Sequence, residues 1–330
     1  KRGRKTWLID HSQKTAEKIR ISGGGRCNFT NLYASPENYL SQNTHFCKSA
    51  LKQYTQHDFI ALVEKHNIPS HEKTLGQLFC DHSAQDIINM LLKECSDAGV
   101  QFEQGIEILD VKKQDESFIV TTNKNSQTKC SSVVIASGGL SIPKIGASKF
   151  GYDLAKKFGL NVINTRPALV PLTFQSHILE FCKSLSGLSL DAEVTCYKVC
   201  FSEGLLFTHR GLSGPSILQI SSYRKDRQHI SINLRPNTQI SAFLLEQKRK
   251  GNKQAVHTAL SVLLPKKLAI KIWEHQDISG RISDLPDKAL LNLGAMMNTW
   301  NIRPSGTEGY RTAEVTLGGV DCDELSSKTM

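Results

Sequence analysis

The sequence lacks the features that mark several classes of protein. Its 330 residues contain no apolar run near the roughly 18 residues of a membrane-spanning helix, so we expect no membrane association. Gly (23 residues) and Pro (10 residues) are not abundant, which excludes collagen-like and low-complexity chains. The nine Cys are odd in number and irregularly spaced. This favours reduced thiols in a cytoplasmic protein over a disulfide framework.

Motifs for metals and for nucleoside triphosphates are also absent. Cys196 and Cys200 have no second pair at zinc-site spacing, and no His-Glu-x-x-His occurs, so we expect no metal site. No Gly-Lys-Ser/Thr sequence exists to form a P-loop. The dinucleotide fingerprint G-x-G-x-x-G is incomplete, because Gly23-x-Gly25 is followed by Asn28 where the last Gly should stand.

The net charge of +10 is concentrated in two segments. Residues 1–31 carry a surplus of six positive charges, and residues 240–275 carry a surplus of five. The second segment holds Lys248, Arg249, Lys250, Lys253, Lys266, Lys267 and Lys271. Such a segment can meet the phosphates of a cofactor or of RNA. A solvated basic face without a partner is the alternative.

Hydrophobic periodicity predicts a chain that mixes strands and helices. Lys5–Ile9 has the composition of a short buried strand, and the fully apolar run Val133–Ala136 that of a strand covered on both faces. Capping patterns at Thr55 and Ser83 predict helix starts, and Gly99 ends the second helix. Residues 174–235 are expected to be β-rich, residues 240–300 helical, and residues 312–320 strand with glycine.

Three segments carry residues that suit a dinucleotide. Asp10 ends a strand, where an acid can accept hydrogen bonds from ribose hydroxyls; a simple turn residue is the alternative. The glycine-rich run Ser22–Asn31 can form an anion-binding nest beside Arg26, or be a flexible surface turn. The glycines of Ala136–Gly139 follow the predicted strand and allow a ligand to approach, although an ordinary strand–loop turn has the same composition.

Taken together, these segments resemble one family. The run "ISGGGRCNFTN" (Ile21–Asn31) is similar to the signature of the BaiN/YhiN-like flavoproteins, bacterial NAD(P)/FAD-dependent oxidoreductases of the two-dinucleotide-binding-domain superfamily. Five more segments match in the same order and extend the resemblance over essentially the whole chain: Gly76–Leu91, Val133–Gly146, Arg166–Phe174, Gly204–Ser222 and Thr312–Val320.

The resemblance implies an α/β fold with three parts. A Rossmann-like FAD-binding domain takes residues 1–172 and 312–330. A small β-barrel takes residues 173–236 and 300–311. A helical insert domain takes residues 237–299. The zones of strand and helix composition described above lie at matching places.

The resemblance also implies the cofactor and the residues around it. FAD is the expected cofactor, with NAD(P)H as the electron donor, and the flavin carries out the redox chemistry. Asp10 is expected to hold the adenosine ribose. The full set of expected cofactor-binding residues is Asp10, Ser22, Gly23, Gly24, Gly25, Arg26, Cys27, Asn28, Ile108, Ala136, Ser137, Gly138 and Gly139.

The substrate side is less defined by the sequence. His209 is the candidate catalytic residue because an imidazole exchanges protons near neutral pH, with Thr208 and Ser213 beside it. A turn residue that packs is the alternative for His209, and a redox thiol is a further hypothesis for Cys27. We expect a small-molecule substrate. An RNA-interacting flavoprotein, or an RNA-binding module that uses the basic insert, is the competing function.

The resemblance further predicts that these residues are an internal fragment. Family members have a strand with G-x-G-x-x-G before the position of Lys1 and a Gly-Glu…Gly-Gly-Tyr-Asn segment after that of Met330. We therefore expect the 330 residues to bind FAD poorly when expressed alone.

Overall fold

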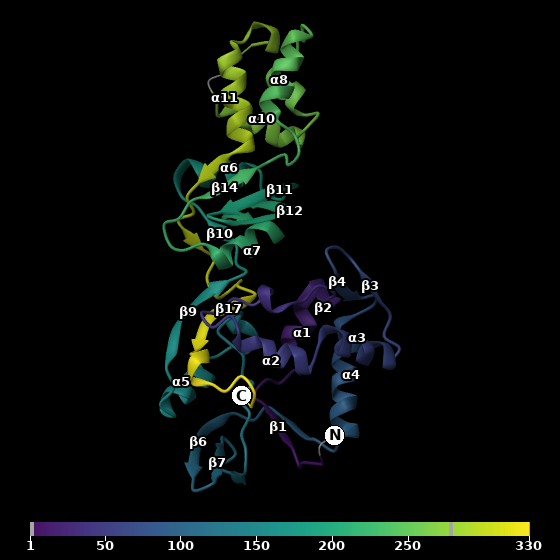
Figure 1. Cartoon of the computed structure of the whole chain (residues 1–330), viewed down its shortest axis with the longest axis vertical. Coiled ribbons are helices and arrows are strands. Elements are labelled where there is room, and N and C mark those ends of the chain that lie inside the picture. Colours follow the sequence, from purple (N-terminus) through teal and green to yellow (C-terminus); the bar gives the residue numbers. More distant parts are fainter. Residues whose placement is uncertain (1–2, 277–279, 330) are drawn as a thin grey trace. The chain divides into compact units, whose positions relative to one another are not determined.

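The structure is a computed structural model that describes residues 3–276 and 280–329, and its chain divides into two compact units (Figure 1). Unit 1 consists of Lys1–Gly139, Pro143–Asn164 and Gly318–Met330, and unit 2 of Leu140–Ile142 and Thr165–Leu317. Residues 1, 2, 277–279 and 330 fall in the predicted domain ranges but outside the described residues. The predicted division into three domains stays a prediction.

Unit 1 is built from short strands and helices. Its strands are β1 (Trp7–Asp10), β2 (Asn28–Asn31), β3 (Ser70–Glu72), β4 (Gln77–Cys80), β5 (Gln101–Gln104), β6 (Ile108–Gln114), β7 (Ser117–Thr122) and β8 (Gln127–Cys130). Its helices are α1 (Glu17–Ile21), α2 (Phe46–Gln53), α3 (Gln56–Lys65), α4 (Ala84–Asp97) and α5 (Phe150–Lys157). The strands form the pair β1–β5 and two three-stranded sheets, in the orders β2-β4-β3 and β6-β7-β8.

The pair β1–β5 is the parallel element expected of a Rossmann-like unit. The strand predicted at Lys5–Ile9 is confirmed as β1, which runs parallel to β5 and places Asp10 opposite Gln104. A parallel pair needs a crossover connection, and α4 comes directly before β5. The capping prediction for α4 is confirmed, because Ser83 caps its start and Gly99, with φ 69°, follows its end.

The apolar run Val133–Ala136 is not the buried strand that its composition predicts. It has no regular secondary structure, and Val134 and Ile135 are 87% and 44% exposed. No strand of the described chain pairs with it. Its backbone therefore lacks a ladder of hydrogen bonds, and its side chains lack a facing layer. An apolar run forms a buried strand only where neighbours supply both.

Unit 2 combines one large sheet with a set of helices. An antiparallel sheet of seven strands has the order β15-β14-β11-β12-β13-β10-β16. Its strands are β10 (Leu172–Thr173), β11 (Ser189–Cys196), β12 (Val199–Thr208), β13 (Gly211–Ser213), β14 (Ile230–Asn233), β15 (Trp300–Ile302) and β16 (Gly306–Thr307). The helices are α6 (Ser176–Ser184), α7 (Pro215–Tyr223), α8 (Ile240–Arg249), α9 (Val256–Leu260), α10 (Lys266–Glu274) and α11 (Asp287–Asn298). The β-rich and helical zones are thus confirmed.

One further strand pair, β9 (Val162–Ala168) with β17 (Val315–Val320), holds residues of both units. Strand β17 covers most of the segment 312–320, for which a strand with glycine was predicted. No helix among the described residues is both long enough and apolar enough to cross a membrane.

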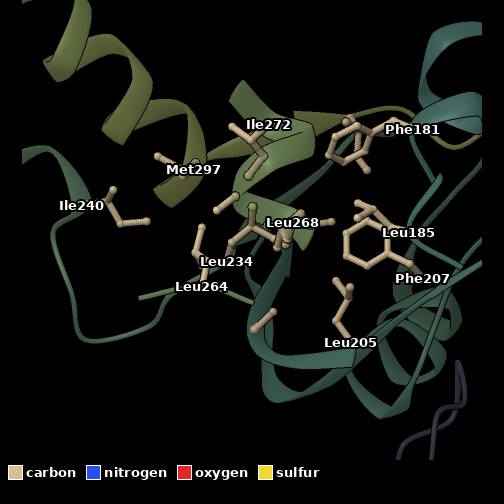
Figure 2. Close-up of a cluster of buried hydrophobic side chains, with 14 of the residues drawn as sticks. Phe181, Leu185, Leu205, Phe207, Leu234, Ile240, Leu264, Leu268, Ile272 and Met297 are labelled. Carbon is tan, nitrogen blue, oxygen red and sulfur yellow. The ribbon is translucent and has the colours of Figure 1, made fainter. Parts of the chain in front are cut away.

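A single hydrophobic core joins the sheet and the helices of unit 2. Figure 2 shows Phe207 of β12 among side chains from α6 and α10, including Phe181 and Leu268. Helix α11 packs against α8 at Gly294, where an added Cβ would lie 2.2 Å from the backbone N of Ser241. The helices therefore pack closely on one another and share one hydrophobic core with the sheet.

Candidate functional site

The glycine-rich run forms a tight turn between α1 and β2. Ser22–Gly25 is a short 3-10 turn in which Gly23 and Gly24 have φ of 57° and 67°, and Gly25 has φ 87°. The backbone N of Cys27 donates to the carbonyl of Ser22 (3.1 Å) and closes the turn. Three consecutive residues in the left-handed region are accessible at low cost only to glycine.

The two sides of this turn differ in packing. A Cβ on Gly23 would lie 2.7 Å from the backbone N of Asn28 and 2.7 Å from the ring of Phe79, so this glycine is packed against β2 and β4. A Cβ on Gly24 or Gly25 would meet no atom within 4 Å. The turn is therefore held on one side and open to a ligand on the other.

A cavity of about 200 Å³ lies beside the turn. Its lining includes Ser22, Cys27 and Asn28 from the predicted cofactor set, and Phe29 and Phe59 from neighbouring elements. Neither of these two Phe residues, whose ring centroids are 6.1 Å apart, is among the predicted site residues. In the sequence, Phe59 is one of the periodic apolar residues of α3, and Phe29 is an apolar residue of β2. Neither pattern indicates that the two rings line a cavity.

Cys27 faces the interior of unit 1 and not the open side of the turn. It is 4% exposed, and Cys80, from β4, is fully buried in the same hydrophobic cluster. Burial raises the pKa of Cys27 above its usual value and that of Cys80 to about 12. Cys80 was not among the predicted site residues, because nothing in the sequence shows that β4 lies beside the turn. Thiols with raised pKa values are poor nucleophiles, so this arrangement gives the redox-thiol hypothesis for Cys27 no support.

Asp10 makes the local contacts of a turn residue. Its Oδ1 accepts a hydrogen bond from the backbone N of Ser12 (2.9 Å) and lies 3.8 Å from Nδ1 of His11. The carboxylate is half-buried at the end of β1. The geometry is compatible with both the turn role and the ribose role given by the sequence.

The remaining predicted cofactor residues lie on other elements of unit 1. Ile108 begins β6 and pairs with Thr122. Ala136–Gly139 lies in the irregular segment after β8, where Gly138 has φ 73° and open space around its Cβ position. Arg26 is exposed next to the turn. The structure thus brings Ser22, Cys27 and Asn28 together around one cavity, with Gly23–Arg26 in the same turn. It places Asp10, Ile108 and Ala136–Gly139 on separate segments.

These residues fit the group that the resemblance implies, FAD. Gly24, Gly25 and Gly138 present bare backbone with room above it, which is the surface that a pyrophosphate or a flat ring can approach. Arg26 supplies a positive charge beside the turn, and Asp10 an acceptor for hydroxyls. Within the described residues, no group of three or more His, Cys, Asp or Glu side chains is placed to hold a metal ion.

The substrate-side candidates lie in unit 2, at the turn between β12 and β13. Thr208 stabilises this turn, because its Oγ1 accepts hydrogen bonds from the backbone N of Arg210 (3.2 Å) and of Gly211 (3.1 Å). His209 is exposed at the tip, and Ser213 pairs with Leu206 in the sheet. The hydroxyl of Thr208 therefore has the capping role that the sequence left open for His209.

A family model decides which group of proteins the chain resembles. The model described as "HI0933-like protein Rossmann domain" matches residues 1–330. The chain belongs to this family. It is the family of the BaiN/YhiN flavoproteins, so both the resemblance and the α/β, Rossmann-like fold class are confirmed. The protein is an enzyme of a flavoprotein oxidoreductase family.

Three curated relatives align with nearly the whole chain. It is 50% identical to the "Ribosomal RNA dihydrouridine synthase" of Escherichia coli, over 99% of this chain and 82% of the relative. It is 44% identical to the protein of the same name from Haemophilus influenzae, over 100% of this chain and 83% of the relative. The "3-dehydro-bile acid delta(4,6)-reductase" of Clostridium scindens is 23% identical, over 98% of this chain and 82% of the relative.

Proposed function

We propose that this protein is an FAD-dependent reductase that converts uridine to dihydrouridine in ribosomal RNA, with NAD(P)H as the electron donor. The observation that carries the proposal is the 50% identity, over 99% of this chain, to a relative named for that reaction. The RNA-related function that the sequence left as an alternative is thereby favoured over a small-molecule substrate. A ribosomal substrate also fits the predicted cytoplasmic location.

The names of the relatives share a chemical theme. Dihydrouridine forms by reduction of the C5–C6 double bond of uracil, which is conjugated to a carbonyl. A 3-dehydro steroid with double bonds at positions 4 and 6 has the same conjugation. In uracil, a hydride is added to C6, the β-carbon of the enone, and a proton to C5, the carbon next to the carbonyl; in the steroid too, conjugation with the carbonyl makes the distal carbon of the double bond the hydride acceptor. The balanced reaction is uridine + NAD(P)H + H⁺ → dihydrouridine + NAD(P)⁺.

The residues of unit 1 have the binding roles in this proposal. Bound FAD would supply the hydride chemistry. Asp10 would accept hydrogen bonds from the ribose, and Gly24 and Gly25 would lie along the cofactor with their backbone exposed to it. Arg26 would offset the charge of the pyrophosphate. Ile108 and Ala136–Gly139 would contact the dinucleotide, as the family resemblance implies.

The carbon next to the carbonyl must receive a proton from a side chain or from water. His209 is the candidate side chain, because it is exposed and carries an imidazole. Thr208 and Ser213 would position the substrate around it.

The test uses protein that has been purified with its flavin identified by mass and absorbance. Ribosomal RNA lacking dihydrouridine is incubated with the protein and either NADH or NADPH, and nucleosides are then analysed by mass spectrometry. A gain of two hydrogens on a uridine supports the proposal. A control with RNA but no nicotinamide cofactor must show no gain. Folded, flavin-loaded protein that oxidises NAD(P)H but leaves every uridine unchanged would refute the substrate assignment.

A further inference from the structure

Positive charge collects at one end of the helical layer of unit 2. The C-terminus of α8 carries Lys248, Arg249 and Lys250, and the loop that follows carries Lys253. Arg281 precedes α11, and Lys288 lies in its first turn. We call these six residues the basic helix end. Two of them, Arg281 and Lys288, lie outside the basic segment 240–275 that the sequence analysis singled out.

Backbone and side-chain contacts hold these segments next to one another. Lys248 Nζ lies 2.5 Å from Asp287 Oδ1 and so ties the end of α8 to the start of α11. Ala255 forms a bridge with Arg281, and the backbone N of Ser283 donates to the carbonyl of Asn252 (3.2 Å). The loop carrying Lys253 therefore runs beside the segment carrying Arg281.

The end of α8 is itself fixed by a glycine turn. Gly251 adopts φ 68°, and its backbone N donates to the carbonyl of Lys248 (2.8 Å). The N of Asn252 donates to the carbonyl of Gln247 (3.1 Å). This pair of bonds is the Schellman motif of a helix C-terminus. Because this backbone is already fixed, less conformational entropy is lost when a ligand binds these cations.

Most of these cations are available for an external anion. Only Lys248 and Lys250 form ion pairs with described residues, to Asp287 and to Glu246. The other four have exposed side chains and make no such pair: Arg249, Lys253, Arg281 and Lys288. Within the described segments 246–253 and 281–288, the six cations are accompanied by three acids, Glu246, Asp284 and Asp287. The hydrogen bond from Lys248, with a smaller effect of Arg249, lowers the pKa of Asp287, so this acid is ionised near neutral pH. Even with all three acids ionised, six cations leave an excess of three positive charges in these segments.

The aromatic residues of this region do not offer a stacking surface. Trp273 packs on His257, with ring centroids 4.8 Å apart. Trp300 packs on Phe181 (5.6 Å) and on Phe207 (6.4 Å) within the core. Single-stranded bases are commonly bound by stacking on exposed aromatic rings. The basic helix end therefore suits the phosphate backbone and not the bases.

We propose that the basic helix end binds the phosphate backbone of the ribosomal RNA substrate, through Arg249, Lys253, Arg281 and Lys288. The inference rests on the proposed function, because the class of partner comes from it; the location and the contact type come from the structure. Binding at this surface is independent of base sequence and dependent on salt. It would hold a large RNA against the enzyme while other residues select the uridine.

The test replaces these four residues together by Gln in the flavin-loaded protein. The control variant replaces Lys112, Lys113, Lys124 and Lys129, four exposed cations of the β6–β8 sheet and its β7–β8 turn, so that the same charge is removed elsewhere. Binding of protein-free, refolded ribosomal RNA is measured by filter retention between 50 and 200 mM KCl. Each lost phosphate contact reduces the slope of log K against log salt by about 0.7–0.9. The test variant should lose about 3 in slope and on the order of 100-fold or more in affinity at 0.1 M salt, and the control variant much less.

The outcomes separate this inference from the proposed function. Flavin content and NAD(P)H-dependent flavin reduction should be the same in all three proteins. If the test variant binds RNA like the parent, or if both variants weaken equally, the basic helix end is not the RNA surface. If the parent binds RNA through this surface but forms no dihydrouridine, the proposed reaction fails while the surface stands.

Discussion

Replacing Gly23 and Gly24 by Ala, one at a time, tests the two-sided structure of the glycine turn. Both residues have positive φ, so each substitution should cost roughly 1–2 kcal/mol for placing an L residue in the left-handed region. Only Gly23 lacks space: its Cβ would lie 2.7 Å from both Asn28 N and the Phe79 ring. Overpacking of this kind adds about 1–3 kcal/mol. We therefore expect losses of about 2–5 kcal/mol for Gly23→Ala and about 1–2 kcal/mol for Gly24→Ala.

The effect on cofactor binding should have the opposite order. The methyl group of Gly24→Ala would occupy the open side of the turn, where we propose that FAD lies, and should weaken FAD at least about tenfold, or about 1.4 kcal/mol. Gly99→Ala is the matched control, because Gly99 also has positive φ (69°) and open space but lies after α4. It should lose stability like Gly24→Ala and keep its FAD affinity.

The assays are chemical denaturation of the flavin-free proteins and fluorescence titration with FAD. Equal stability of Gly23→Ala and Gly24→Ala would refute the close-packing argument. Unchanged FAD affinity in Gly24→Ala would refute the approach of the cofactor over the open side.

Four further predictions concern separate parts of the chain. Phe207 is fully buried in the core of unit 2, so Phe207→Ala should destabilise that unit by about 3–5 kcal/mol in denaturation; a loss below 1 kcal/mol would contradict the packing of Figure 2. Thr55 caps α3, and Thr55→Ala should cost about 0.5–2 kcal/mol, measured in the same way, with Thr55→Ser as the variant that keeps the cap. Burial in the folded state raises the pKa of Cys80 from 9.0 to about 12. The unfolded chain therefore loses this proton first, and the unfolding free energy should fall as the pH rises from about 9 to 12; a Cys80→Ala variant should show a smaller fall, because the pKa of buried Cys182 is also raised to about 12. His209→Gln should reduce dihydrouridine formation while the flavin stays bound and NAD(P)H still reduces it, and unchanged turnover would remove His209 from the catalytic candidates.

Local signals in the sequence were reliable because their physics is local. The cap at Thr55 satisfies backbone donors within the same turn, and it is formed as predicted. Gly99 adopts positive φ after α4, as its position predicts. The alternation of β-rich and helical zones in unit 2 followed from composition in the same way.

Structural features that depend on residues far away in the sequence could not be predicted from local patterns. Val133–Ala136 has the composition of a buried strand, but its state depends on strands that must lie on either side. Cys80 lies beside Cys27 only because β2 and β4 pair, with the backbone N of Cys80 donating to the carbonyl of Arg26 (3.0 Å). In the candidate site, the glycine turn could be predicted from its motif, whereas the Phe rings of its cavity could not.

The positive charges that lie together at the basic helix end are not the same as those that lie together in the sequence. The surplus in residues 240–275 includes Lys271, whose Nζ lies 2.6 Å from Glu274 Oε2 and is partly neutralised by it. Arg281 and Lys288 belong to no basic run in the sequence, yet the bridge at Ala255 and the ion pair of Lys248 bring their segments to the end of α8. A potential at a surface is summed over space and not along the chain. The residues to mutate are therefore those gathered at one end of the helical layer, including two that no window of the sequence would have selected.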